Sequence, residues 1–224
     1  MSIKFIIERI PLEEYYPRTC DIILWRPLRL FEYTICSCIR QPWHHVSMLV
    51  VGGESKLPYI LEQNIDLASE TPKPLRGLLE KGYYFDIFRA NLTKKQRQRI
   101  RRSFVNITKY QYSYRDAINT WSGRRLPKDW ILDKVSFLPG GELLITYSDT
   151  QSPLYSYKIV NRLTCVAAVV AAFCLNNINL LSYDKSLDIL TCTPGDLYFS
   201  KHLKYLGSIN NRTEIKIVGS SRRI

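Results

Sequence analysis

The stretch NRLTCVAAVVAAFCL, residues 161–175, predicts a helix that is buried on every side. Thr164 is a favourable N-cap, and residues 165–175 contain no charged residue, no Pro and no Gly. The uncharged, mostly apolar run from Leu163 to Leu175 has 13 residues, whereas roughly 20 are needed to cross a bilayer. We therefore expect a helix in the protein core and no transmembrane segment.

Cys165 would lie in the first turn of this helix. There the unpaired backbone N–H groups and the positive end of the helix dipole favour a thiolate over a thiol. The alternative interpretation is that Cys165 is a small apolar residue that only fills space in the core. Residues elsewhere in the sequence indicate whether Cys165 is a reactive thiolate or a core residue.

Length and composition limit the class of protein. A chain of 224 residues is long enough for one sizeable core, and a hydrophobic content of 46% is typical of a folded protein. The net charge of +12 predicts an anionic neighbour, which is a nucleic acid, a membrane surface or an acidic protein face.

The cysteines indicate a reducing compartment. Their number is even, six, but the chain opens MSIKFIIERIP, without the basic and uninterrupted apolar regions of a signal peptide. We therefore expect free thiols and an intracellular, cytoplasmic location.

Periodicity and turn residues predict an α+β fold. We expect strands at residues 2–9, 20–26, 46–51, 59–62, 83–89, 143–147 and 213–218, and helices at 28–39, 94–107, 165–175 and 198–203. A further helix is expected to start within residues 113–116, with turns at 72–75 and 193–197. The strands at 46–51 and 59–62 form a predicted hairpin, which brings His45 close to Glu62.

The helix at 94–107 carries many basic residues on the side away from Ile100, Phe104 and Ile107. These residues form either a solvated face or a docking surface for phosphates or acidic partners. They are Lys94, Lys95, Arg97, Arg99, Arg101 and Arg102.

Cys165, His45 and Glu62 have the residue types of a cysteine nucleophile, its base and an acid that orients the base. A thiol needs a base to form the thiolate, and the base needs an acceptor that fixes its tautomer. From residue types alone the three are one of several such combinations in a chain with three His and six Cys.

The order of short motifs resembles that of circularly permuted papain-like hydrolases of the NlpC-type superfamily. The resemblance is to the YiiX-like and poxvirus-encoded branches in particular, with lecithin:retinol acyltransferase as a more distant relative. It covers residues 18–203 and is carried by these segments: Cys20-Asp21-Ile22-Ile23, His45-Val46-Ser47-Met48, Ile60-Leu61-Glu62, Ile87-Phe88-Arg89, Tyr112-Ser113-Tyr114, Thr164-Cys165 and Thr193-Pro194-Gly195-Asp196-Leu197.

The resemblance implies a permuted papain-like fold, an antiparallel sheet packed on the helix that begins with Cys165. It implies a cysteine hydrolase or acyltransferase, which would be a peptidase, an amidase or a thioesterase. The enzyme would act on a peptide or lipid acyl group and would need no cofactor. Cys165 would be the nucleophile, His45 the base and Glu62 the orienting acid. Tyr112 or Tyr114, with the Cys165 N–H, would stabilise the oxyanion.

We expect one domain over residues 1–224, with an insertion at about 122–158 and a basic tail at 219–224. Within the insertion, residues 134–157 are expected to form loops and a hairpin around Pro139-Gly140-Gly141. Two short segments depart from the family pattern. The first strand begins with Cys20-Asp21 instead of Gly-Asp, and Val166-Ala167 stands after the nucleophile where Ser-Glu is frequent.

Three alternatives to an enzymatic function are compatible with the sequence. His44 and His45 beside Trp43 would be packing residues, or they would bind zinc together with Cys36 and Cys38, although that spacing is unusual for zinc ligands. The third alternative is a non-catalytic docking protein of the same fold. The resemblance to a poxvirus branch would make it a minor capsid or virion-associated protein of a large DNA virus, part of a larger assembly.

Overall fold

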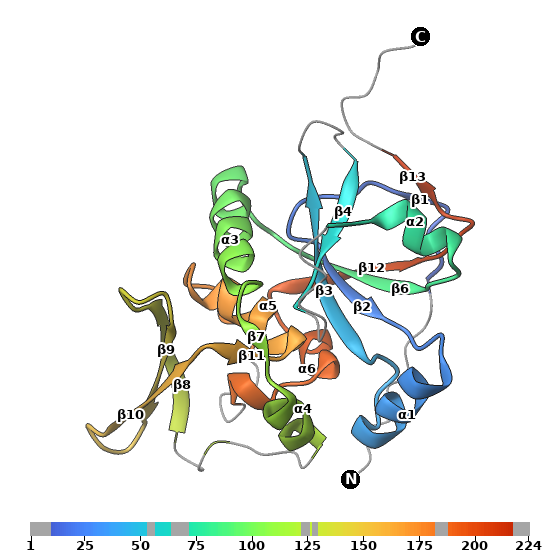
Figure 1. The fold of residues 1–224 in the computed structure, drawn as a ribbon. Coiled ribbons are helices and arrows are strands. Elements are labelled where there is room, and N and C mark those ends of the chain that lie inside the picture. Colours follow the sequence, from blue (N-terminus) through green and yellow to red (C-terminus); the bar gives the residue numbers. More distant parts are fainter. Residues whose placement is uncertain are drawn as a thin grey trace.

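The computed structural model describes residues 10–52, 57–63, 72–121, 126, 130–181 and 188–216. Helices and strands combine in an α+β arrangement around a six-stranded antiparallel sheet with the strand order β12-β6-β2-β3-β4-β5 (Figure 1). Its strands are β2 (Ile22–Trp25), β3 (His45–Val51), β4 (Pro58–Leu61), β5 (Lys73–Pro74), β6 (Phe85–Ala90) and β12 (Leu203–Ile209).

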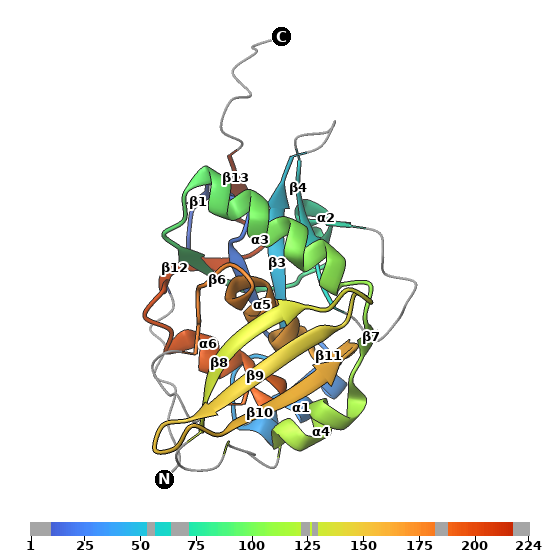
Figure 2. The ribbon, with the colours of Figure 1, turned by 90° about the vertical axis from the view of Figure 1, so that its left-hand side faces the viewer.

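The helix predicted from residues 161–175 is α5 (Cys165–Cys174), and every residue from Cys165 to Phe173 is buried. It is buried on all sides because it lies between two sheets. One neighbour is β3, and the other is a three-stranded sheet of β8 (Trp130–Phe137), β9 (Leu143–Asp149) and β10 (Tyr155–Val160). Figure 2 shows this small sheet covering α5. A helix without a solvent-facing side needs no polar stripe, which explains its composition.

Helix α3 (Lys94–Ile107) packs against α5 on the same side of the large sheet. Thr93 caps it, because the Thr93 hydroxyl accepts a hydrogen bond from the Gln96 N–H at 3.2 Å. Ile100, Phe104 and Ile107 form its buried side, as their spacing predicts.

The opposite face of the large sheet has its own core, to which Ile23, Leu49, Ile60 and Ile87 contribute. It is covered by helix α2 (Leu75–Glu80) and by a two-stranded parallel pair, β1 (Glu14–Tyr15) with β13 (Glu214–Ile215). The remaining elements surround the amino-terminal end of α5. They are α1 (Leu30–Ile39), β7 (Gln111–Tyr112), α4 (Tyr114–Trp121), β11 (Arg162–Leu163), the short 3-10 helix η2 (Ile189–Thr191) and α6 (Pro194–Tyr198).

Two sequence predictions about secondary structure are wrong. Residues 198–203 were predicted to be helical, but α6 begins earlier, at Pro194, and residues from Leu203 onward form β12. The turn expected at 72–75 is a short strand followed by α2, in which Leu75, Leu78 and Leu79 are buried. In both places proline suggested a turn, whereas Pro at or next to the first helical position is compatible with the start of a helix.

The predicted insertion contains more structure than the expected hairpin. β8 and β9 are joined around Gly140 and Gly141 as predicted, but β10 adds a third strand that the sequence analysis missed. The predicted strand at 2–9 and the basic tail at 219–224 lie outside the described residues. No helix within the described ranges is long and apolar enough to cross a membrane.

Candidate active site

Cys165 is the first residue of α5, and its side chain is buried. The Thr164 hydroxyl caps the helix by accepting a hydrogen bond from the Ala167 N–H at 3.2 Å. Thr164 follows β11, which pairs with β7 so that Leu163 is opposite Tyr112. This pairing fixes where α5 begins and places Cys165 beside Tyr112.

His45 is the first residue of β3, where it pairs with Trp25 on β2. The indole ring of Trp25 lies edge-on to the imidazole, with 5.4 Å between the ring centroids. Trp25 is itself held in place, because its Nε1–H donates to the Ser47 hydroxyl at 2.7 Å. The imidazole is therefore confined on one side by a fixed aromatic ring.

The predicted hairpin of β3 and β4 is formed, and Met48 pairs with Leu61. Glu62 follows directly after β4 and therefore lies near the start of β3. Its Oε2 is 2.9 Å from His45 Nε2, and the Glu62 side chain is only 4% exposed. The Glu62 carboxylate also forms an ion pair with the ammonium group of Lys73 on β5.

Cys165 completes the arrangement, because its thiol and the His45 imidazole are close enough to shift each other's pKa. Since Glu62 occupies Nε2 of the imidazole, Nδ1 is the ring nitrogen that remains for the thiol. The structure thus brings together all three residues singled out from the sequence, with His45 between Cys165 and Glu62.

The charges of the three residues stabilise one another. Burial by itself would raise the pKa of the Cys165 thiol, but His45 and the N–H groups of Val46 and Val166 lower it below its ordinary value. Burial would lower the pKa of His45, but Cys165 and Glu62 raise it to about 10. These shifts favour a thiolate beside an imidazolium at neutral pH.

The pKa of Glu62 shifts in the direction that keeps this residue ionised. Burial opposes ionisation, but His45 and Lys73 together lower the pKa of Glu62 to about 2. The neighbouring His44 behaves differently, since burial and then the charge of His45 lower its pKa to about 4. His45 is therefore the histidine that carries a proton near neutral pH, and His44 is neutral.

Of the two tyrosines considered for the oxyanion, Tyr112 lies closer to the thiol. Burial and then the charge of Cys165 raise the pKa of Tyr112. The side chain of Tyr114 packs edge-on against Tyr112, with ring centroids 5.4 Å apart, and is 56% exposed. Tyr112 is thus the tyrosine whose pKa responds to the charge of Cys165.

The basic residues of α3 do not share one exposed face, which corrects the sequence analysis. Lys94, Lys95, Arg99 and Arg102 are exposed, but Arg97 and Arg101 are half-buried. Arg97 Nη1 donates to the Leu92 carbonyl at 2.5 Å, and Arg101 Nη2 donates to the Tyr59 hydroxyl at 3.3 Å. Positions 97 and 101 border the buried stripe at 100 and 104 because a helix has 3.6 residues per turn.

The alternative zinc site is not formed by Cys36, Cys38, His44 and His45. Among the described residues, no three His, Cys, Asp or Glu side chains are close enough together to hold a metal ion. Cys36 is buried whereas Cys38 is exposed on α1, so the two thiols do not share one environment.

Sequence analysis missed three residues that support the site: Lys73, Trp25 and Gln41. Gln41 joins the chain before His45 to the Thr193–Gly195 turn, since its Nε2 donates to the Thr193 hydroxyl at 2.6 Å and its Oε1 accepts from the Gly195 N–H at 2.7 Å. A Cβ at position 195 would lie 2.6 Å from the Gln41 side chain, which explains the glycine. No local pattern links residues that lie so far apart along the chain.

Comparisons with known proteins add one structural similarity. No protein-family model matches the chain, and no curated protein matches its sequence. The chain is similar to the solved structure of the metalloprotein YiiX from Escherichia coli O157:H7, at 15% sequence identity. The alignment covers 86% of this chain and 98% of YiiX, with a TM-score of 0.49. At this level of similarity no property of YiiX is transferred to this chain.

Proposed function

We propose that this protein is a cysteine-dependent hydrolase or acyltransferase that acts on an amide, ester or thioester through an acyl-enzyme. One observation carries the proposal: the His45 imidazole lies between the Cys165 thiol and the Glu62 carboxylate. A nucleophile, its base and an orienting acid in contact with one another form the arrangement that nucleophilic catalysis requires.

The reaction begins with the Cys165 thiolate, which attacks the carbonyl carbon of the substrate. The pKa shifts described above favour this thiolate, with His45 as its protonated partner. Glu62 stabilises the imidazolium at 2.9 Å and fixes its orientation, so we assign Glu62 a positioning role.

Attack converts the carbonyl oxygen into an oxyanion in a tetrahedral intermediate. The Cys165 backbone N–H is at the first position of α5, where helical geometry leaves the N–H without an acceptor inside the helix. We assign this N–H and the Tyr112 hydroxyl as the donors to the oxyanion. Donors that are already oriented toward the developing charge are the main source of stabilisation in acyl transfer.

Collapse of the intermediate breaks the bond to the leaving group, which takes the proton from the His45 imidazolium. The acyl group remains on Cys165 as a thioester. His45, now neutral, removes a proton from water or from another acceptor, which attacks the thioester and releases the acyl group. His45 keeps this proton, and collapse of the second tetrahedral intermediate breaks the C–S bond, which regenerates the Cys165 thiolate beside the imidazolium.

We also propose that the fold is a permuted papain-like domain spanning residues 1–224. The order of the site residues along the chain, His45 and Glu62 before Cys165, supports this proposal, as does the packing of α5 on an antiparallel sheet. In this interpretation the small sheet of β8, β9 and β10 is the main part of an insertion that covers the outer side of α5.

A second candidate function is that of a non-catalytic docking protein in a larger assembly, such as a minor capsid or virion-associated protein. The observation that favours it is the edge strand β10, on which Tyr155 and Tyr157 are 67% and 69% exposed and Ile159 is 52% exposed. These alternate residues share one face of the strand, which points away from the core. Exposed apolar side chains at a sheet edge are typical of protein interfaces.

One experiment separates the two candidates. Wild type and Cys165→Ala are assayed with p-nitrophenyl acyl esters, acyl thioesters and chromogenic peptide amides, and the protein is analysed by mass spectrometry for a covalent acyl adduct. We expect turnover of at least one class and an adduct on Cys165, both lost in Cys165→Ala. The acyl-enzyme proposal is wrong if the two proteins turn over substrate equally. If neither wild type nor Cys165→Ala turns over any substrate, and the double variant Tyr155→Ser/Tyr157→Ser abolishes self-association of the protein, the docking function is supported.

A further inference from the structure

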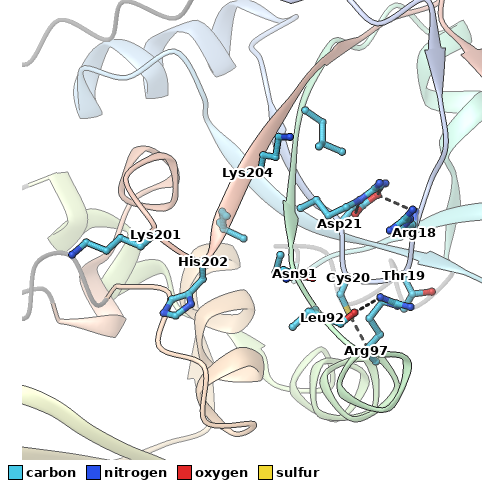
Figure 3. Close-up of a pocket in the computed structure, with 14 residues that line it drawn as sticks. Arg18, Thr19, Cys20, Asp21, Asn91, Leu92, Arg97, Lys201, His202 and Lys204 are labelled. Atoms are coloured by element: carbon cyan, nitrogen blue, oxygen red, sulfur yellow. Dashed lines mark hydrogen bonds and ion pairs between the residues drawn. The ribbon is translucent and has the colours of Figure 1, made fainter.

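A second candidate site lies at the other end of the large sheet, in a pocket of about 300 Å³. It is bordered by the turn before β2, the end of β6, the start of α3 and the beginning of β12 (Figure 3). Trp25 at the far end of β2 pairs with His45. The pocket and the candidate active site therefore lie at opposite ends of β2.

The side chains around this pocket are predominantly cationic. Arg18, Arg97 and Lys204 line it in addition to Arg89, and in Figure 3 Arg18 and Arg97 approach from the side of Asp21. Lys201 also borders the pocket, but Figure 3 shows its side chain extending away from the arginines. We therefore leave Lys201 out of the site.

Asp21 is the only carboxylate among the lining residues, and its oxygens are already occupied. Arg89 donates to it from Nε and Nη2, both at 2.7 Å. Asp21 Oδ2 also accepts from the Tyr15 hydroxyl at 2.5 Å and from the Arg18 N–H at 2.9 Å. This carboxylate compensates the charge of Arg89 and leaves the other cations of the pocket without a counter-charge from the lining.

Strand register places two of the cations side by side. Lys204 on β12 is directly opposite Arg89 on β6. Residues directly opposite each other share a sheet face, and like charges in this position destabilise the pair. Within the described residues no carboxylate forms an ion pair with Lys204, Arg18 or Arg97. Since Asp21 already compensates Arg89, an anion bound in the pocket would compensate Lys204, Arg18 and Arg97.

The backbone beside the pocket adopts a strained conformation. The turn of residues 18–21 is closed by a hydrogen bond from the Asp21 N–H to the Arg18 carbonyl at 3.0 Å. Its third residue, Cys20, has φ +72°, a left-handed value that favours glycine. Strained backbone of this kind is concentrated at ligand sites. Here the turn holds Arg18 at the edge of the pocket.

We propose that this pocket binds a phosphate group, carried either by a small soluble ligand or by a lipid headgroup. Arginine presents its donors in a planar fork that matches two phosphate oxygens. Arg18 and Arg97 would contact the phosphate from one side and Lys204 from the other, while Arg89 remains paired with Asp21. This inference is independent of the chemistry proposed for Cys165.

The test measures binding of inorganic phosphate to the full chain by titration calorimetry at low ionic strength, with chloride as the competing anion. The variant Arg18→Gln/Lys204→Gln removes two exposed charges from the pocket. The control Arg99→Gln/Arg102→Gln removes the same charge from exposed positions on α3 outside this pocket. We expect the pocket variant to bind phosphate about tenfold or more weakly, and the control to bind like wild type.

Vesicles of phosphatidylcholine with and without phosphatidic acid then identify the source of the phosphate. Sedimentation with phosphatidic acid vesicles that is lost in the pocket variant indicates a headgroup, whereas phosphate binding without sedimentation indicates a soluble ligand. The proposal is overturned if wild type binds no phosphate at millimolar concentration, or if the two double variants weaken binding equally. Equal weakening would indicate general attraction of polyanions to a basic protein. Cys165→Ala should bind phosphate as wild type does.

Discussion

His45 Nε2 lies 2.9 Å from Glu62 Oε2, although 17 residues separate the two along the chain. The hairpin of β3 and β4 places them at the same end of the two strands, and Trp25 limits the imidazole on one side. His45 therefore presents its other nitrogen to Cys165 from a fixed position.

Alkylation should distinguish an activated thiolate from a packed thiol. Iodoacetamide labelling, resolved by residue with mass spectrometry, should modify Cys165 below the pH at which ordinary cysteines react, because His45 lowers the pKa of Cys165. His45→Ala should slow labelling of Cys165 strongly. Cys38, exposed on α1, is the internal control, and its labelling should not change. Equal labelling of Cys165 with and without His45 would refute the activated thiolate.

Glu62→Gln should lower kcat/KM by about tenfold or more, because a neutral amide neither stabilises the imidazolium nor fixes its orientation. The pH profile provides the more specific readout. Glu62 helps to raise the pKa of His45 to about 10, so the alkaline limb of the profile should move to lower pH in the variant. Glu32→Gln removes the same charge near His44, whose Nε2 is 3.8 Å from Glu32, and should leave the alkaline limb in place.

Tyr112→Phe should lower kcat with little effect on KM, because the proposed hydrogen bond to the oxyanion forms only in the transition state. Steady-state kinetics with the best acyl substrate measures both constants. Tyr114→Phe is the matched control, since Tyr114 is exposed and should give values close to wild type. If both variants reduce kcat equally, Tyr112 has no specific role at the oxyanion.

Acid should destabilise the protein through Glu62. Its pKa is about 2 in the folded protein and near 4.5 in the unfolded chain, so the stabilisation is complete above pH 4.5 and is lost as the pH falls toward 2. Linkage gives a contribution of roughly 3 kcal/mol. Urea unfolding between pH 6 and pH 2.5 should therefore show a smaller loss of unfolding free energy in Glu62→Gln than in wild type. Glu80→Gln, which removes an exposed carboxylate, should lose as much as wild type.

Cys20 should tolerate glycine better than alanine. Its φ of +72° costs an L-residue about 1 kcal/mol, which glycine avoids. Both substitutions remove the hydrogen bond of the Cys20 thiol to the Arg97 carbonyl at 3.3 Å, so their difference isolates the backbone effect. Urea unfolding should find Cys20→Gly more stable than Cys20→Ala. The reverse order would show that side-chain packing outweighs the backbone strain.

The elements whose signals are local can be predicted from the amino-acid sequence alone. The absence of charge, Pro and Gly in residues 165–175 predicted α5, the spacing of Ile100, Phe104 and Ile107 predicted the buried side of α3, and the apolar runs predicted β2, β3, β4 and β6. The same signals located Cys165 at a helix start and His45 near Glu62 at the ends of a hairpin. Each of these inferences depends on residues that are close together along the chain.

Contacts between residues that are distant along the chain became evident from the tertiary structure. It placed Cys165 against His45, paired Lys73 with Glu62, and chose Tyr112 over Tyr114 at the site. It also made residues 203–209 an edge strand beside β6, which gathered Lys204 and Arg89 around the second pocket. These contacts form when whole sheets and helices pack against one another. The burial of apolar surface that drives this packing is spread over many residues, so no single residue carries a sequence signal for the contact.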